Sequence, residues 1–392
     1  MSNSSSITEF LLLAFADTRE MQLLHFWLFL GISLAALLGN GLIITAMACD
    51  HHLHTPMYFF LLNLSLLDLG SISTTLPKAM DNSLWDNRHI SYLGCAAQVF
   101  FLLFLISAEF SLLTIMSYDR YVAICKPLHY GTLLGSRACV HMAAAAWGTG
   151  FLYAVLHTAN TFSLPLCQGN AVDQFFCEVP QILKLSCSGL DYLREAGLLV
   201  VTVFFSSACF VFIVVSYVQI LRAVLRIPSE QGRHKAFSTC LPHLAMVSLL
   251  ISTGMFAYLK PPSVSSPSLD LVVSFLYSVV PPAVNPLIYS MRNQEIKDAL
   301  KKLITRCMET FQWTALSIGP WGLPLVPCSQ GDFVLLAMAF WIRPFTLFPV
   351  HLTHAYQGVT GCSVKRIVNT EVKHLPCPPL IHQPRHLIAV VG

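Results

Sequence analysis

Long apolar windows dominate the chain up to Met291. A bilayer core about 30 Å thick needs roughly 20 apolar residues in helical form, because each helical residue rises about 1.5 Å. Seven windows of that kind, nearly free of Asp, Glu, Lys and Arg, run approximately over His25–Cys49, Met57–Leu76, Cys95–Tyr118, Cys139–Leu164, Ala196–Leu221, Ala236–Leu259 and Leu271–Met291. In lipid a helix satisfies its own backbone hydrogen bonds, whereas an open strand does not. The pattern predicts an all-α membrane protein, a bundle of seven transmembrane helices.

Composition supports a membrane protein and excludes other classes. The 392 residues are 55% hydrophobic and 11% charged, with a mean hydropathy of +0.63, whereas soluble domains are about 25% charged. A net charge of +3 is too small for a nucleic-acid binder that neutralises many phosphates. Thirteen cysteines without a C-x-x-C pair suggest neither a small disulfide scaffold nor a zinc site, and we expect no organic cofactor.

The charges of the short loops predict the orientation. Connections one, three and five, together with the segment after the last window, hold twelve Lys and Arg residues, and the opposite face holds six. By the positive-inside rule, residues 1–24 are extracellular and the C-terminus is cytoplasmic, as in a multi-pass plasma membrane protein. Asn3 begins an Asn-Ser-Ser glycosylation acceptor on the outer side.

A short amphipathic helix is predicted after the seventh window. In residues 293–306 apolar side chains recur at Ile296, Leu300, Leu303 and Ile304, with lysines opposite, a spacing typical of a helix lying on a membrane surface. The transmembrane domain with this helix covers residues 25–307. Residues 308–392 lack sustained periodicity, and we expect a poorly ordered cytoplasmic tail or the product of a faulty gene model.

Four cysteines fall on the outer face. Cys95 starts the third window, and Cys167, Cys177 and Cys187 lie in the long loop between the fourth and fifth. An oxidising compartment favours two disulfides over free buried thiols. Four cysteines allow three pairings, and the residues alone do not choose among them.

Two acidic residues interrupt the apolar windows. Asp68 and Glu109 are costly in hydrocarbon, so we expect them to face the interior of the bundle. With Asn40 and Asn285, the polar residues of the first and seventh windows, they either share a cation or a proton, or form a neutral hydrogen-bonded pair that packs helices.

A charged pair stands at the inner end of the third window. Asp119 beside Arg120, followed by Tyr121, balances the arginine charge at the membrane edge and leaves the guanidinium able to change partner when helices move. This position favours a conformational switch.

Five stretches of sequence together resemble the hallmark segments of vertebrate olfactory receptors, which are rhodopsin-like G-protein-coupled receptors. They are Leu53–Asp68, Met116–Tyr130, Ser216–Tyr217, Lys235–Leu244 and Pro282–Asn293. The resemblance covers about residues 1–307. Within it, Tyr258–Ser263 and Pro267–Asp270 are similar to the family-14 subgroup.

The resemblance implies roles for residues that the sequence alone leaves open. It implies the disulfides Cys95–Cys177 and Cys167–Cys187. It also implies a G-protein contact in which Asp119 restrains Arg120 at rest, and Arg120 moves toward Tyr217 and Tyr289 on activation. Asp68 and Glu109 match acidic positions associated with a sodium ion.

By the same analogy, an odorant pocket lies between the third, fifth and sixth helices beneath the second outer loop. Its expected lining is Val99, Leu102, Leu103, Ile106, Ser107, Val201, Phe205, Ile251 and Tyr258. Only Ser107 and Tyr258 are polar, which suits a small volatile of modest polarity and disfavours amines and carboxylates. Gln174 stands where many relatives have a histidine, so we expect no metal-assisted sensing.

The expected function is that of an odorant receptor, not an enzyme. A volatile ligand shifts the population of helix arrangements, and the active state stimulates an olfactory-type heterotrimeric G protein that raises cAMP. One alternative is a chemoreceptor of the same family expressed outside the olfactory epithelium. Another is an ion transporter, against which stand the odd number of spans and the lack of an internal repeat. Odorant identity and oligomeric state are not predicted.

Overall fold

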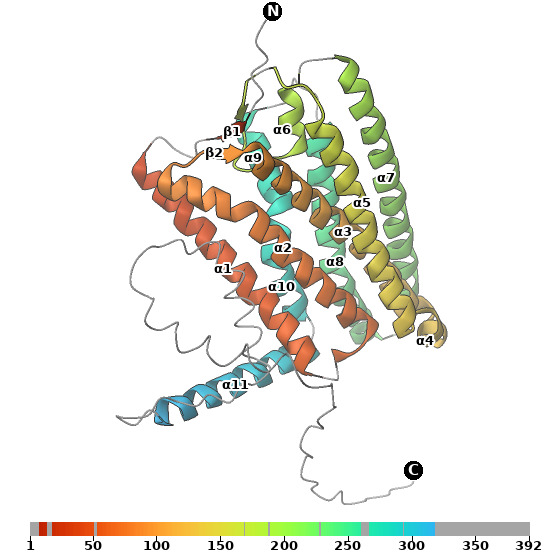
Figure 1. Ribbon diagram of the computed structural model, residues 1–392. Helices are drawn as coiled ribbons and strands as arrows, with labels where there is room; N and C mark the ends of the chain where they lie inside the picture. The colour runs from red at the N-terminus through yellow and green to blue at the C-terminus, as the bar shows by residue number, and fades with distance from the viewer. Residues whose placement is uncertain are drawn as a thin grey trace, which may run out of the picture. The chain divides into compact units, whose positions relative to one another are not determined.

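A computed structural model describes residues 8–317 apart from 14–17, 51–52, 168, 187–188, 227–228, 260–265 and 293. Within these residues the bundle consists of α1 (Arg19–Cys49), α2 (Pro56–Trp85), α3 (Tyr92–Cys125), α5 (Ser136–Phe162), α7 (Gly189–Leu225), α8 (Glu230–Leu259) and the consecutive pair α9 (Pro267–Ser278) and α10 (Val280–Arg292). Figure 1 shows these helices side by side. The predicted all-α bundle is confirmed.

Five of the described helices are long and apolar enough to cross a bilayer. The criterion is met by α1, α2, α3, α5 and the Val200–Leu225 part of α7. A sixth span results if α9 and α10, which are bent by 41° at their junction, are counted together. The remaining helix, α8, contains the shorter apolar stretch His243–Ala257. Prolines at 281 and 282 follow the bend directly, and proline removes a backbone donor from the helix.

Helix starts follow the local sequence. Pro56 and Pro267 occupy the first turns of α2 and α9, where a missing backbone N–H leaves no hydrogen bond unmade. The Ser91 hydroxyl accepts a hydrogen bond from the Gly94 amide at 3.1 Å and caps α3, and Ser266 caps α9 in the same way.

The central helix of the bundle is α3. It contacts α2, α5, α7 and α8, and its approach to α5 depends on Gly150. A Cβ atom at this glycine would lie 2.8 Å from both the Ala108 nitrogen and the Phe104 carbonyl oxygen of α3. Backbone atoms of two helices therefore meet at a residue that has no side chain, as is common between transmembrane helices.

We expect Gly150→Ala to lower the thermal stability of the purified protein, because the added methyl group forces α5 away from α3. Overpacking of this kind costs about 1–3 kcal/mol. Gly148→Ala on the same helix is the matched control, since a Cβ atom there meets nothing within 4 Å, and should be neutral or slightly stabilising. Equal melting temperatures for the two variants would show that the contact between α3 and α5 is not close.

Three short strands and a small helix cover one end of the bundle, here named the disulfide end (Figure 1). In this sheet β1 (Glu9–Leu12) pairs antiparallel with β2 (His89–Ser91) and parallel with β3 (Ala171–Val172). The N-terminal segment is held there by Phe10 and Leu12, which are buried in a cluster with the Cys95 and Cys177 side chains. The short helix α6 (Val179–Lys184) follows.

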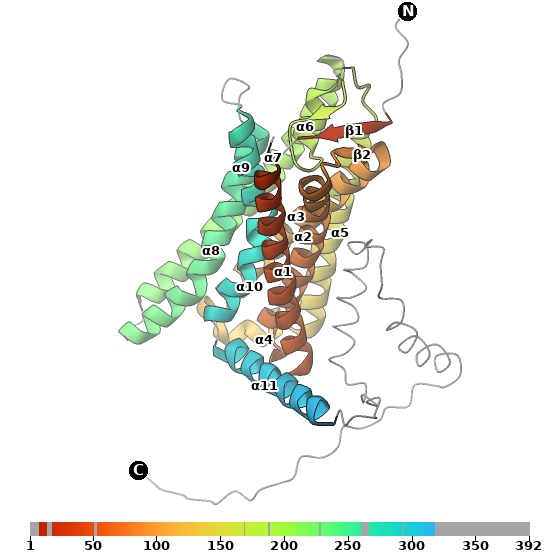
Figure 2. The ribbon, with the colours of Figure 1, turned by 90° about the vertical axis from the view of Figure 1, so that its left-hand side faces the viewer.

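The opposite end carries η2 (Pro127–His129), α4 (Tyr130–Leu133) and α11 (Gln294–Ser317). Figure 2 shows α11 lying across the end of the bundle that is opposite the disulfide end. Ile296 and Ala299 are buried, and the Tyr58 hydroxyl donates to Glu295 Oε2 at 2.6 Å. The helix extends past the predicted residue 306. Residues 318–392 lie outside the described residues, so the predicted tail stays a prediction.

Candidate functional site

A cavity of about 360 Å³ lies between α3, α5, α7 and α8, in the half of the bundle nearer the disulfide end. Aliphatic and aromatic side chains make up most of its wall. Its lining consists of Leu102, Leu103, Ile106, Ser107, Phe110, Ser111, Thr149, Leu152, Tyr153, Leu156, His157, Leu198, Val201, Thr202, Val203, Phe205, Ser206, Leu250, Ile251, Gly254, Met255 and Tyr277. An apolar cavity with a few polar groups is typical of a small-molecule site.

Most of the sequence-predicted pocket residues come together in this wall. Those that line the cavity are Leu102, Leu103, Ile106, Ser107, Val201, Phe205 and Ile251. Val99 is instead buried in the cluster around Cys95 and Cys177 at the disulfide end. The side chain of Tyr258 lies outside the described residues.

The contribution of α5 is not visible in the sequence. Thr149, Tyr153 and His157 of this helix line the cavity, and none is among the predicted residues. Their window is apolar on all sides, so periodicity does not distinguish a cavity-facing position from a lipid-facing one.

His157 and Thr202 form the polar contact between α5 and α7 in the cavity wall. His157 Nε2 lies 3.1 Å from Thr202 Oγ1, and the Tyr153 ring packs on the imidazole with centroids 4.2 Å apart. The side chain of His157 is 5% exposed. A ligand in the cavity therefore meets a hydrogen-bonded pair that joins two helices.

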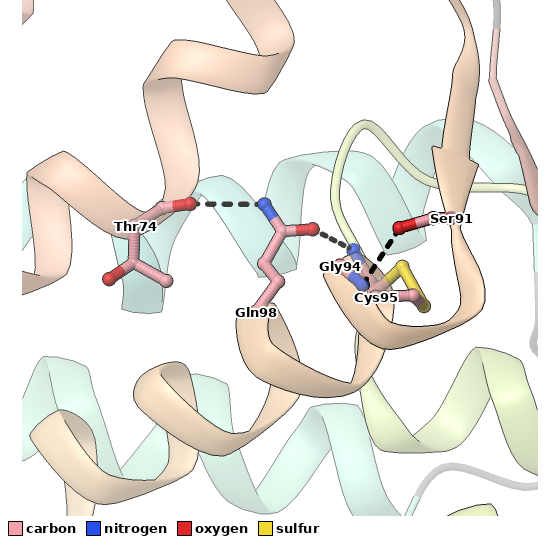
Figure 3. Close-up of a disulfide and its surroundings, with 6 residues drawn as sticks. Thr74, Ser91, Gly94, Cys95 and Gln98 are labelled. Carbon is pink, nitrogen blue, oxygen red and sulfur yellow. Dashed lines mark hydrogen bonds between the residues drawn. A yellow bond between two sulfur atoms is a disulfide. The ribbon is translucent and has the colours of Figure 1, made fainter. Parts of the chain in front are cut away.

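The loop after α5 is fixed to the bundle by the Cys95–Cys177 disulfide. Gln98 supports this bond: its Nε2 donates to the Thr74 carbonyl oxygen at 3.0 Å, and its Oε1 accepts from the Cys177 amide at 2.8 Å (Figure 3). Cys167 is also disulfide-bonded. Cys187 lies outside the described residues, so its pairing with Cys167 stays a prediction.

Glu178 connects the same loop to α9. Its buried carboxylate accepts hydrogen bonds from the hydroxyls of Tyr277 and Ser274, the latter at 3.1 Å. Gln174 Nε2 donates to Ser274 Oγ at 2.8 Å. The glutamine that stands where many relatives have a histidine is therefore part of this contact. Because Tyr277 also lines the cavity, the loop and the cavity wall share a residue.

Burial raises the pKa of Glu178 above the usual glutamate range, and the hydrogen bonds from Tyr277 and Ser274 oppose part of that effect. A raised pKa means that the folded state holds the proton more tightly than the unfolded state. Stability from this site is therefore full at low pH and is lost as pH rises from the ordinary glutamate pKa through the raised one. Lys184 and Asp270, 3.5 Å apart, lie beside it.

We expect the melting temperature of the purified protein to fall as pH rises through this window, and Glu178→Gln to flatten the dependence, because glutamine resembles the protonated acid. Asp81→Asn is the control, since Asp81 is a partly exposed carboxylate paired with Lys78 at the same end. An unchanged pH dependence in Glu178→Gln would assign the titration to another group.

At the other end of α3, Asp119 binds two partners. Its Oδ2 accepts from Arg120 Nε at 2.9 Å and from Arg120 Nη2 at 2.5 Å, and its Oδ1 accepts from the Tyr130 hydroxyl of α4 at 2.8 Å. Burial and the Asp119 carboxylate raise the pKa of Tyr130, so it stays protonated and donates. Tyr130 ends the stretch Met116–Tyr130 that resembles a hallmark segment, but its contact with Asp119 depends on the turn after α3.

Tyr217 and Tyr289 do not bond to Arg120 in this arrangement. The Tyr217 hydroxyl lies 2.5 Å from His243 Nδ1. The Tyr289 hydroxyl is buried without a hydrogen-bond partner among the described residues. Tyr121 packs under Lys126, whose Nζ lies 5.8 Å from the ring centroid. The geometry corresponds to Arg120 held by Asp119.

The intramembrane acids lie in the interior, as expected. Asn285 Nδ2 donates to both carboxylate oxygens of Asp68 at 3.1 Å, and Glu109 interacts with the same asparagine. Asn40 Nδ2 donates to the carbonyl oxygens of Ala36 and Pro282 at 3.0 Å. The Oδ1 atoms of Asn40 and Asn285 have no hydrogen-bond partner among the described residues.

These oxygens fit a hard cation, which prefers carboxylate and carbonyl ligands. Within the described part of the chain, no group of three or more His, Cys, Asp and Glu side chains could hold a metal ion. A site here would therefore depend on the two carboxylates together with amide oxygens.

A ligand-sized cavity lies in one half of a multi-helix bundle, and an Asp–Arg pair lies at the other end of a helix that lines it, which is the arrangement expected of a seven-helix receptor. Comparison with known proteins agrees. Residues 29–307 match the sequence profile described as olfactory receptor. Human olfactory receptor 14A16 is 52% identical over 304 residues, which cover 78% of this chain and 98% of the relative.

Further human relatives give the same result. Olfactory receptor 14J1 is 49% identical over 306 residues, or 78% of this chain and 95% of its own length, and olfactory receptor 10C1 is 46% identical over 304 residues, or 78% and 97%. The chain belongs to the olfactory receptor family, resembles its family-14 members, and is a multi-pass membrane receptor rather than an enzyme.

Proposed function

We propose that this chain binds a small volatile odorant in the cavity around α3 and activates a stimulatory olfactory-type G protein, which raises cAMP. One observation carries the proposal: a single helix, α3, lines the cavity with Leu103, Ile106 and Ser107 and bears the Asp119–Arg120 pair. A ligand that favours one position of α3 would thereby bias the partner choice of Arg120.

In the active arrangement Arg120 leaves Asp119 and turns toward Tyr217 and Tyr289. One feature supports this step: the Tyr289 hydroxyl is buried without a partner among the described residues. Tyr217, which contacts His243 in this arrangement, would exchange that partner for Arg120. Movement of α3 against α7 and α10 would open a groove at the α11 end for the G protein.

We propose that the disulfide end is extracellular and the α11 end cytoplasmic. The disulfide supports this orientation, because disulfides persist in oxidising compartments. The excess of Lys and Arg in the loops at the α11 end agrees. Asn3 would then be glycosylated; it lies outside the described residues.

A sodium ion held by Asp68 and Glu109, with the amide oxygens of Asn40 and Asn285, is part of the proposed resting state. The unpartnered amide oxygens support it. Bound there, the ion would supply a positive charge that lets both carboxylates stay ionised, while the chain holds α1, α2, α3 and α10 together through these residues.

The test is cAMP accumulation in cells that carry the chain at the surface together with an olfactory-type G protein, challenged with a broad odorant panel. We expect a dose-dependent rise for at least one volatile and no rise in cells that lack the chain. Binding of a volatile to the purified protein without any cAMP rise at verified surface level would contradict the proposed pathway.

A further inference from the structure

Three hydroxyl groups in the cavity wall turn their hydrogens away from the cavity. Thr202 Oγ1 donates to the Leu198 carbonyl oxygen at 2.9 Å, and Ser111 Oγ donates to the Ser107 carbonyl oxygen at 2.9 Å. Thr149 Oγ1 donates within α5, 2.9 Å from the Ala145 carbonyl oxygen. A hydroxyl has one hydrogen and two lone pairs. With the hydrogen used by its own helix, each oxygen faces the cavity as an acceptor.

Two of these oxygens face each other. Ser111 Oγ of α3 and Thr149 Oγ1 of α5 are 3.4 Å apart, and both hydroxyls can donate to backbone carbonyl oxygens. Either hydroxyl could also donate in this contact, and in each arrangement the pair keeps at least one oxygen lone pair for a donor from the cavity. A hydrogen supplied from the cavity would be accepted by either oxygen.

The contact between His157 and Thr202 also leaves an oxygen lone pair without a donor. When the Thr202 hydrogen is bonded to the Leu198 carbonyl oxygen, the 3.1 Å contact with Thr202 Oγ1 is donated by His157 Nε2–H. Thr202 keeps a second lone pair. Tyr277, another hydroxyl of the wall, donates to Glu178. Ser107 and Ser206 retain rotatable hydroxyls that accept as readily as they donate.

We propose that the cavity selects ligands that donate a hydrogen bond, namely alcohols and phenols, over carbonyl compounds and ethers with the same carbon skeleton. This inference rests on the proposed odorant-binding function and names its ligand class. At Thr202, Ser111 and Thr149 an acceptor-only ligand would place its oxygen against oxygen lone pairs, so it would depend on the hydroxyls of Ser107 and Ser206 to replace its hydrogen bond to water. A volume of about 360 Å³ suits a compact terpene alcohol or a short alkyl alcohol.

The test is ligand binding to the purified full-length chain, measured as ligand-induced thermal stabilisation. The probes are three matched pairs: menthol and menthone, borneol and camphor, octanol and octanal. We expect each alcohol to bind about five- to tenfold more tightly than its carbonyl partner, since a net hydrogen bond contributes that ratio.

Variants separate the cavity hydroxyls from general solubility effects. Thr202→Val combined with Thr149→Val keeps the side-chain shape but removes two acceptors, so the alcohol preference should fall to about twofold or less, whereas Thr→Ser at both positions should keep it. Thr74→Val is the matched control, because Thr74 makes the same bond within its own helix, to the Gly70 carbonyl oxygen at 2.8 Å, outside the cavity wall.

The outcomes are distinct. Equal binding of alcohols and carbonyl compounds, or tighter binding of the latter, overturns the inference and leaves odorant binding intact. An alcohol preference that survives loss of both threonine hydroxyls also overturns it. Binding of none of the six probes, together with none of a wider volatile panel, contradicts the inference and the proposed function alike.

Discussion

Arg120→Ala should abolish the odorant-evoked cAMP response while the receptor still reaches the cell surface and binds its ligand. In this structure the guanidinium makes two hydrogen bonds to Asp119 Oδ2, and in the proposed active arrangement it would contact the G protein. Alanine removes both interactions. The response should fall to the level of cells without receptor, in a cAMP assay at matched surface expression.

The control must separate signalling from folding. Asp119 is 1% exposed, and a buried carboxylate that loses its partner is destabilising, although Tyr130 still donates to it. Arg137→Ala removes an exposed arginine from the start of α5 at the same end and should signal normally. A full response in Arg120→Ala would refute the proposed switch.

Gly254→Trp should eliminate odorant binding and signalling without preventing folding. Gly254 lines the cavity, and a Cβ atom there meets nothing within 4 Å. The indole would therefore extend into open space and occupy much of the ligand volume. We expect no ligand-induced thermal stabilisation and no cAMP rise for any volatile that acts on the unmodified chain.

Gly148→Trp is the matched control. A Cβ atom at Gly148 also meets nothing within 4 Å, but this residue is exposed and does not line the cavity. It should bind and signal as the unmodified chain does. A normal odorant response in Gly254→Trp would place the ligand elsewhere.

The helices of the bundle are the part of the fold that the sequence predicts best. The cost of burying backbone polar groups in lipid leaves few alternatives to a helix once a window of about 20 apolar residues is present. The short strand β1 was not expected, because the four residues Glu9–Leu12 form a strand only when β2 and β3 lie beside them. Such pairing depends on distant segments.

The functional site also contains some features that the sequence predicts and others that it does not. Asp119 and Arg120 are conspicuous in the sequence because charged side chains at a membrane edge are costly unless they are paired. In the structure the two side chains are hydrogen-bonded to each other. The contacts of Tyr130, His157 and Thr202 are not predictable from the sequence, because they form between α3 and α4 and between α5 and α7. Spacing along one helix carries no information about which neighbouring helix a side chain meets.

Odorant-stimulated nucleotide exchange tests the central claim most directly. The purified chain is reconstituted in a bilayer with an olfactory-type heterotrimeric G protein, and GTP uptake by the G protein is measured with and without a volatile that stabilises the receptor. We predict faster exchange with the volatile for the unmodified chain and no acceleration for Arg120→Ala. Binding of the volatile without faster exchange, or equal acceleration in both proteins, would contradict the account.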